Sequence, residues 1–276
     1  MNKINKCIKY IFLSNFKNWS MFAYVLILPL LIQIILFYFY INRSIKPDEI
    51  IAVGPFLSLS IIVAGTFIPY FLISWRETVF LRQLQNFGIK KWEFLFSMAV
   101  VFSVYALSSY IFSSSVLCIL DSFTINKVVL KYFDGFFRNK AFILMIINLW
   151  ILSLMILMVN ILISGRLTNI YLAQVFVVLF IVWILIFGDF FIHNSLTQMR
   201  GVLILSYLNP VKYVNWVYYL TYSGTLWNLS NTYYIIANPN YFVSFKYIYG
   251  PLFSSLIFVT CFSYFSHVTL NNGLKK

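Results

Sequence analysis

Side chains that could carry catalysis or bind a metal are few in this sequence and lie far apart. His193 and His267 are its only histidines, and neither has a carboxylate or a cysteine at the spacing that metal ligands require. The three cysteines, Cys7, Cys118 and Cys261, fall in separate segments, which indicates neither a disulfide nor a metal site. We therefore expect structural or interfacial histidines, small apolar cysteines and no metal site.

Two short motifs resemble parts of known catalytic sites. The stretch Asp134–Arg138 (DGFFR) is similar to the start of the alcohol-phosphatidyltransferase motif, but no further aspartate follows before Asp189 to hold the metal. Ser223-Gly224 suits an intramembrane serine protease, yet no helix-borne histidine partner is present. A GxxxxGK[ST] nucleotide loop is absent. We expect a solvated loop with a glycine turn at Asp134–Arg138 and no catalytic residue on this chain.

Long apolar runs make up most of the chain, so the elements they form must position any functional residues. Of its 276 residues, 62% are hydrophobic and 10% are charged, whereas soluble proteins have roughly 25% charged residues. Six runs reach the about 20 residues that a helix needs to cross a bilayer, and they lack the alternation of barrel strands. The sequence predicts an all-α polytopic membrane protein with six transmembrane helices, at residues 21–41, 51–74, 94–120, 141–163, 167–188 and 247–268.

We expect a single transmembrane domain over residues 1–276. Its parts would be an interfacial amphipathic helix, spans one to five, an outer segment, and a sixth span with a cytoplasmic tail, at residues 1–20, 21–188, 189–246 and 247–276. Pro29 and Gln33 interrupt the first span and are expected to kink it or to face other helices. A signal peptide is the alternative for the N-terminus, but the first apolar run is too long and no small-residue cleavage site follows it.

The net charge of +13 does not indicate a nucleic-acid partner, because the cations are spread over the loops, where they suit anionic membrane lipids. If the N-terminus is inside, the short inner segments carry eleven Lys and Arg, and the longer outer segments carry nine together with five of the seven acids. This bias predicts that both termini are cytoplasmic. The abundance of Phe, Ile, Tyr, Asn and Lys suggests an AT-rich genome, and we expect a bacterial plasma membrane.

A short charged island, Trp75–Phe94, separates the second and third spans. It holds four cations and two anions, whereas the flanking apolar runs hold none. Thr78–Phe87 contains no Pro or Gly, which predicts a short amphipathic helix that Gly88 ends. Such a helix on the cytoplasmic surface suits a soluble partner or lipid headgroups. An ordinary positive-inside loop without a partner is the alternative.

The outer segment between the fifth and sixth spans contains two apolar patches, Val202–Leu208 and Val214–Thr225, which Asn209-Pro210 separates. Each patch is too short to cross a bilayer, so we expect it to re-enter the membrane partway or to lie in the interface. Tyr and Trp crowd this segment, and both prefer the interface. Because no acid lies in the middle of a span, proton-coupled transport is disfavoured, and a transporter of this kind would need energy from a partner.

The order of these elements resembles the membrane subunit of ABC-2 type exporters. In that family the loop between spans two and three reads R-E, then R-L, then a small turn and a basic residue. The corresponding residues here are Arg76-Glu77, Leu81-Arg82, Leu84, Gly88 and Lys90-Lys91. The family usually has G-T after R-E and Pro at the turn, where this chain has Thr78-Val79 and Gly88. Family members also carry two half-helices between spans five and six, to which Leu208–Val211 with Tyr213-Val214 is similar.

The resemblance implies a permease subunit that holds no cofactor itself. Two permease copies, or this chain and a paralogue, would form the pathway, and two cytoplasmic ABC ATPase subunits would bind ATP and Mg²⁺. The residues implied in coupling to the ATPase are Arg76, Glu77, Leu81, Arg82, Leu84 and Gly88. Those implied in an outer re-entrant gate are Asn209, Pro210 and Tyr213.

The cargo is not specified by any motif. An aromatic outer segment and a pathway without charges favour an amphiphile, such as a peptide or bacteriocin, a hydrophobic drug, or a lipid. Export and self-protection against such a compound both remain open. The alternative function is an integral-membrane enzyme or an accessory protein without an ATPase partner.

Overall fold

A computed structural model describes residues 3–41, 47–77, 88–167, 169–190, 200–223, 244–245 and 247–273 of the chain, and all regular elements among them are helices. Six helical segments are long and apolar enough to cross a membrane. These confirm the predicted all-helical, multi-pass architecture, with small shifts at the ends of the spans. They are Trp19–Phe39, Ile50–Trp75, Lys91–Ser122, Phe142–Arg166, Ile170–Phe187 and Tyr249–Thr269.

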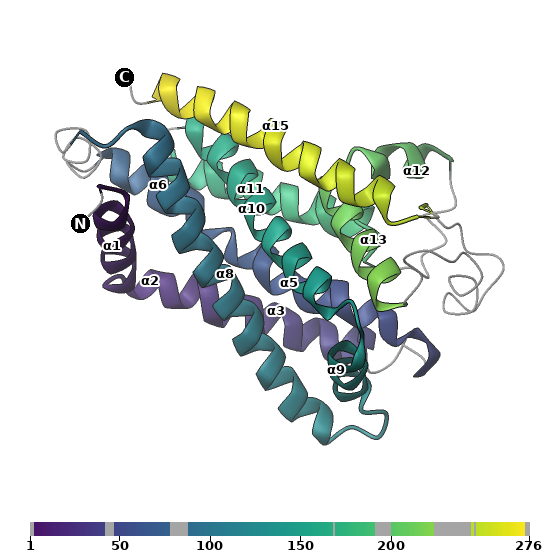
Figure 1. Ribbon diagram of the computed structural model, residues 1–276. Helices are drawn as coiled ribbons and strands as arrows, with labels where there is room; N and C mark the ends of the chain where they lie inside the picture. Colours follow the sequence, from purple (N-terminus) through teal and green to yellow (C-terminus); the bar gives the residue numbers. More distant parts are fainter. Residues whose placement is uncertain are drawn as a thin grey trace.

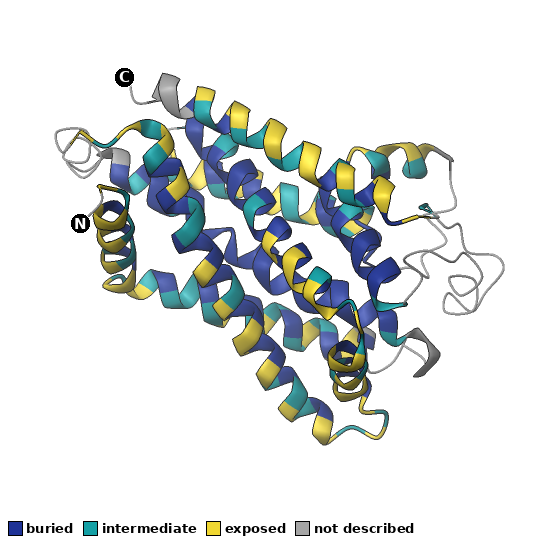
Figure 2. Ribbon diagram, in the orientation of Figure 1, coloured by how far each residue is buried: buried dark blue, intermediate teal, exposed yellow. Residues whose placement is uncertain are grey.

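The second span forms the centre of the bundle. It consists of α5 (Val53–Ala64) and α6 (Phe67–Glu77), and 94% of its most apolar window is buried, against 22% for the first span and 17% for the fifth and sixth. Dark blue residues accordingly run through α5 in Figure 2, while exposed residues line α15 (Tyr249–Gly273). A helix that is apolar on all sides needs protein around it or lipid, and here protein surrounds it.

The long helices α8 (Lys91–Ser122) and α10 (Phe142–Arg166) pack against the central span, and α11 (Ile170–Phe187) packs against α6. In Figure 1, helix α1 and the C-terminal end of α15 lie at one end of the bundle. The helices α12 (Arg200–Tyr207) and α13 (Pro210–Tyr222) lie toward the other end.

The first span combines α2 (Trp19–Phe22), η1 (Ala23–Ile27), α3 (Leu28–Leu36) and η2 (Phe37–Ile41). Pro29 lies in the first turn of α3, directly after the π-helical turn η1. Gln33 is buried and donates from Nε2 to the Leu57 carbonyl oxygen at 2.8 Å. It therefore faces the second span, as one of the two sequence expectations stated.

Helix α1 (Lys3–Phe16) covers most of the predicted N-terminal amphipathic helix. Its buried residues, Cys7, Ile11 and Asn15, recur every four positions and so lie on one face. That face packs against α8, where the Tyr105 hydroxyl donates to the Phe12 carbonyl oxygen at 3.1 Å. Other apolar side chains of α1 are exposed, and these are Tyr10, Leu13 and Phe16.

The expected solvated loop at Asp134–Arg138 is wrong, because these residues complete the helix α9 (Val128–Arg138). Four apolar side chains of α9 are buried at helical spacing, and their packing outweighs the roughly 1 kcal/mol that Gly135 costs a helix. Asp134 and Arg138 are exposed and pair with each other one turn apart, with Nε and Oδ1 3.0 Å apart. The buried set is Val128, Val129, Tyr132 and Phe136.

Candidate functional site

The chain leaves α11 through a tight turn at Gly188 and Asp189. A Cβ on Gly188 would lie 2.4 Å from the Ile184 carbonyl oxygen and 2.8 Å from the Phe190 ring, so no larger residue fits. Asp189 follows with φ 54°, in the left-handed region that Asp enters more readily than most residues. This turn places the Asp189 side chain, which is 8% exposed, against α13.

Three side chains of α13 meet Asp189 from one face of that helix. The Lys212 Nζ lies 3.3 Å from Asp189 Oδ2, and Trp216 Nε1 donates to the same oxygen at 2.7 Å. The Tyr219 hydroxyl donates to the Asp189 backbone oxygen at 2.6 Å. Positions i, i+4 and i+7 share a helix face, so α13 presents a cation and two donors to a single acidic residue. We call this cluster, Asp189 with Lys212, Trp216 and Tyr219, the acidic junction.

Lys212 is almost fully enclosed, with 1% of its side chain exposed. Its Nζ donates to Ser206 Oγ at 2.6 Å and lies 4.2 Å from the centroid of the Tyr207 ring. Burial lowers the pKa of the Lys212 ammonium, and the Asp189 carboxylate opposes that shift. A buried charge needs a counter-charge and further hydrogen bonds to be tolerated. Lys212 receives these from the turn after α11 and from α12.

Two asparagines tie α13 to the last turn of α11. Asn209 caps α13, because its Oδ1 accepts from the Val211 N–H at 3.0 Å, and its Nδ2 donates to the Ile184 carbonyl oxygen at 3.3 Å. Asn215 donates from Nδ2 to the Gly188 carbonyl oxygen at 2.6 Å. The last carbonyls of a helix have no partner inside the helix. These two amides therefore satisfy oxygens that the end of α11 leaves open.

The residues assigned from sequence to an outer gate, Asn209, Pro210 and Tyr213, lie together at the start of α13. Pro210 occupies its first turn, where the missing N–H costs nothing. The Tyr213 hydroxyl donates to the Tyr207 carbonyl oxygen at 2.7 Å, and its ring packs 5.4 Å from that of Phe258 in α15. Tyr213 thus links α13 to α12 and to the sixth span.

The contacts of the acidic junction are structural, because they hold α13 against α12 and the end of α11. The Asp189 carboxylate is engaged by two donors, and the hydroxyl nearest to Lys212 accepts its hydrogen bond. Within the described ranges, no three His, Cys, Asp or Glu residues gather as metal ligands. His267 lies on α15, and Ser223 donates locally to the Leu220 carbonyl oxygen at 3.0 Å. His193 and Gly224 lie outside the described residues.

The charged loop after α6 is only partly described. Arg76 and Glu77 are the last residues of α6. The predicted coupling helix at Thr78–Phe87, with Leu81, Arg82 and Leu84, lies outside the described residues.

The described end of this loop is built around Gly88. Its φ of 66° is in the left-handed region where glycine is favoured. A Cβ at Gly88 would lie 3.4 Å from Lys3 Nζ, so α1 reaches this end of the loop. Glu93 then caps α8, because its Oε2 accepts from the Lys90 N–H at 2.7 Å.

No protein-family model matches the chain, and no curated protein matches its sequence. The family resemblance therefore depends on the order of the sequence features alone.

Sequence reasoning missed the acidic junction. Asp189 and Lys212 were counted as separate loop charges, because the glycine turn that brings them together is not a recognisable motif. A signal was nevertheless present, since Lys212, Trp216 and Tyr219 recur at i, i+4 and i+7 after a proline that starts a helix. A cation on such an otherwise aromatic face requires a buried acid, and Asp189 is the one acid after the fifth span.

Proposed function

We propose that this chain is the membrane-spanning permease subunit of an ATP-driven exporter of the ABC-2 type. The observation that carries the proposal is the order of elements along the chain. An N-terminal helix precedes two spans, an R-E loop and three further spans, and then come two short helices that meet at Asn209-Pro210 and the last span.

In this function the energy comes from a partner. The sequence contains no nucleotide-binding loop, so two cytoplasmic ABC ATPase subunits bind ATP and Mg²⁺. Two permease copies, or this chain and a paralogue, enclose the pathway. The loop from Arg76 to Gly88 docks on the ATPase and moves when the ATPase dimer closes. Supporting this assignment, α6 leads into the loop without interruption, and α8 begins three residues after Gly88.

The proposed cargo is an amphiphile, such as a peptide or bacteriocin, a hydrophobic drug or a lipid. In the described part of the chain, the only buried ion pair is the one between Asp189 and Lys212, and both partners are already engaged. The aromatic side chains of α13 suit a molecule with both apolar and polar parts.

Co-purification tests this function directly. The tagged chain is solubilised in mild detergent, and a soluble ATPase of the ABC type should purify with it. In Glu77→Ala the chain should still insert in the membrane, but the ATPase should be lost or should no longer respond to cargo. Removing one partner of a buried charge pair at an interface costs about 2–5 kcal/mol, which is enough to abolish a micromolar complex at working concentrations.

A matched control is Asp134→Ala, which removes an exposed acid on α9 and should leave the complex intact. Orientation is tested separately with a cysteine at Gln85, which should react with an impermeant reagent only after the cells are opened. If no ATPase purifies with the wild-type chain, or if Glu77→Ala and Arg82→Ala both export normally, the proposed coupling is wrong.

A further inference from the structure

The central span is broken halfway along its length, between α5 and α6. Gly65 N–H bonds the Ile61 and Ile62 carbonyls at 3.2 and 3.1 Å, Thr66 N–H bonds Val63 three residues back at 3.0 Å, and α6 begins at Phe67. The cause lies in the sequence. Pro69 has no N–H to offer the Gly65 carbonyl oxygen, which takes the Ile68 N–H at 3.1 Å instead.

One side chain from a neighbouring span reaches this break. Gln174 of α11 donates from Nε2 to the Thr66 carbonyl oxygen at 3.0 Å. It is the only amide in α11, a helix whose other residues are almost all apolar and of which only 17% are buried inside the bundle. A polar side chain at this depth is costly unless it has a partner. Its partner is a backbone oxygen at the irregular point of span two.

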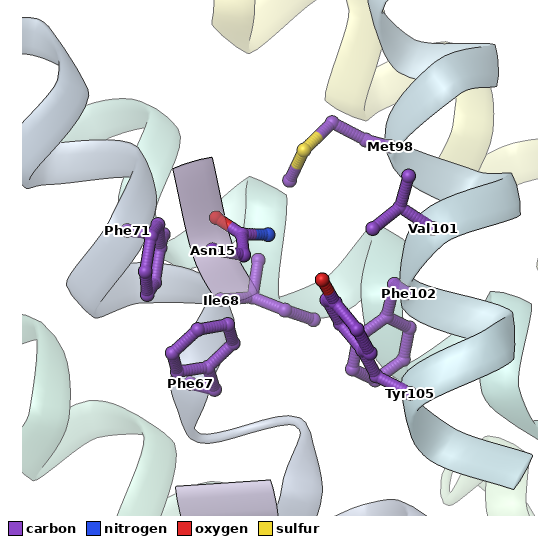
Figure 3. Close-up of a pocket in the computed structure, with 8 residues that line it drawn as sticks. All are labelled: Asn15, Phe67, Ile68, Phe71, Met98, Val101, Phe102 and Tyr105. Carbon is purple, nitrogen blue, oxygen red and sulfur yellow. The ribbon is translucent and has the colours of Figure 1, made fainter. Parts of the chain in front are cut away.

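Opposite sides of the break are packed differently. A Cβ on Gly65 would lie 2.4 Å from Ile156 Cγ2 and 2.9 Å from Asn160 Nδ2, so α10 presses directly on the break. The part of α6 just beyond it borders a small cavity of about 10 Å³ between α1, α6 and α8. Figure 3 shows this cavity with rings of α6 and α8 around the Asn15 side chain. The Asn15 Oδ1 is buried and has no hydrogen-bond partner among the described residues.

We propose that Gly65-Thr66 is a hinge about which α6 swings, and that Gln174 is the positioning residue that holds α6 in the orientation seen here. The tight contact with α10 serves as the pivot, and the small cavity on the side toward α1 and α8 is the one packing gap described beside α6. The hinge itself follows from the geometry alone. Its role in transport rests on the proposed function, in which the loop after Glu77 is what moves α6.

The hinge is tested on the purified full-length chain without any ATPase. Nitroxide labels are attached at Ser74→Cys in α6 and Ile163→Cys in α10, in a variant with its three native cysteines replaced by alanine, and labelled chains are diluted with unlabelled ones. Pulsed EPR then gives the distribution of the distance between the two labels. Gln174→Leu should raise about threefold the population of label distances that differ from the main wild-type distance. A hydrogen bond between membrane helices shifts an equilibrium between two helix orientations by a factor of about that size.

Gln33→Leu is the matched control. Gln33 is likewise a glutamine that donates to a carbonyl of span two, but its acceptors, Phe56 and Leu57, lie in the regular helix α5. This variant should keep the wild-type distribution. Pro69→Ala, which restores the missing N–H, should narrow it. The hinge is refuted if Gln174→Leu and Pro69→Ala both match the wild type, or if Gln33→Leu broadens the distribution as much as Gln174→Leu.

A second measurement addresses transport. In the assembled exporter, Gln174→Leu should lower the amount of cargo moved per ATP hydrolysed, while Gln33→Leu changes only the yield of protein. If Gln174→Leu changes the EPR distances but no ATPase purifies with the chain, the hinge is supported and the proposed function is not. If a functional ATPase complex is found but Gln174→Leu leaves the EPR distances unchanged, the proposed function is supported and the hinge is refuted.

Discussion

The helices of this chain are interrupted at two buried points that are held in different ways, the acidic junction after α11 and the break at Gly65-Thr66. At the acidic junction, the corner between α11 and α13 is closed by an ion pair, two asparagine amides, a tryptophan and a tyrosine. At Gly65-Thr66, within span two, one glutamine from another helix donates to the backbone. Both breaks are buried, and a proline lies four residues after Gly65 in the second of them.

The comparison shows that a break in a helix is not by itself either rigid or mobile. The contacts that neighbouring residues make with the break decide which of the two it is. The acidic junction directs a cation and two hydrogen-bond donors of α13 onto one turn, so every displacement there would leave a buried polar group without a partner. The break in span two would lose one neutral hydrogen bond on moving. We therefore expect substitutions at the junction to affect folding, and those at the span-two break to affect motion.

Lys212→Met should have the largest effect. It leaves the Asp189 carboxylate buried without its counter-charge, which costs about 3–5 kcal/mol. We expect little folded protein, measured as the fraction that remains monodisperse in detergent on heating. The double variant Asp189→Asn with Lys212→Met should recover most of it. The asparagine keeps the left-handed turn and still accepts from Trp216.

Lys131→Met provides the control for charge removal as such, because Lys131 is an exposed lysine on α9. It should melt like the wild type. If Lys131→Met and Lys212→Met lose thermal stability equally, or if the double variant is no more stable than Lys212→Met, the ion pair does not stabilise the contact between α13 and the end of α11.

Gly65→Ala should have the next largest effect. The added methyl would meet Ile156 Cγ2 at 2.4 Å, and overpacking of this kind costs about 1–3 kcal/mol. Ile156→Ala in the same chain should relieve it, which a thermal melt would detect. The comparison variant is Gly201→Ala in α12, where nothing lies within 4 Å of the new atom. If both glycine variants are equally stable, α10 does not press on the break as the structure shows.

The sequence predicted the six spans well because each is a long apolar run whose signal is local. It also placed the break at Asn209-Pro210, since an asparagine before a proline favours a helix start. It could not predict the partners of that break. Asp189 and Lys212 are separated by a segment of more than twenty residues, and their contact depends on how α11 and α13 pack.

The break in span two was missed for a different reason. Gly65, Thr66 and Pro69 were all visible in the sequence, but an uninterrupted apolar run predicts a single helix by length and hydropathy even when it contains prolines. The helix α9 was missed because Gly135 suggested a turn. The helical spacing of its buried residues is clear only once their common face is known.

Asn209→Ala should cost about 1 kcal/mol, the usual value of a helix N-cap, plus the loss of its bond to the Ile184 carbonyl oxygen. Asn169→Ala is the sharper reference, since Asn169 caps α11 through the Tyr171 and Leu172 N–H groups and no other bond of its side chain is recorded in the described chain. Thermal melts should therefore show a larger loss for Asn209→Ala. Equal losses would mean that the link to α11 contributes nothing beyond the cap.

Tyr213→Phe should have the smallest effect and the most local one. The change removes the hydroxyl that donates to the Tyr207 carbonyl oxygen at 2.7 Å, but it keeps the ring against Phe258. One hydrogen bond contributes about 0.5–1.5 kcal/mol. Because α12 is otherwise held to α13 by the Ser206–Lys212 contact, amide hydrogen exchange should quicken in α12 and stay unchanged in α13.

The same measurement on Tyr105→Phe gives the counterpart at the other end of the bundle. There the lost hydroxyl donates to Phe12 of α1 at 3.1 Å, so faster exchange should appear in α1 and not in α12. If Tyr213→Phe instead quickens exchange throughout α13, the two short helices move together. The acidic junction would then not fix α13, and α12 and α13 would form one mobile unit.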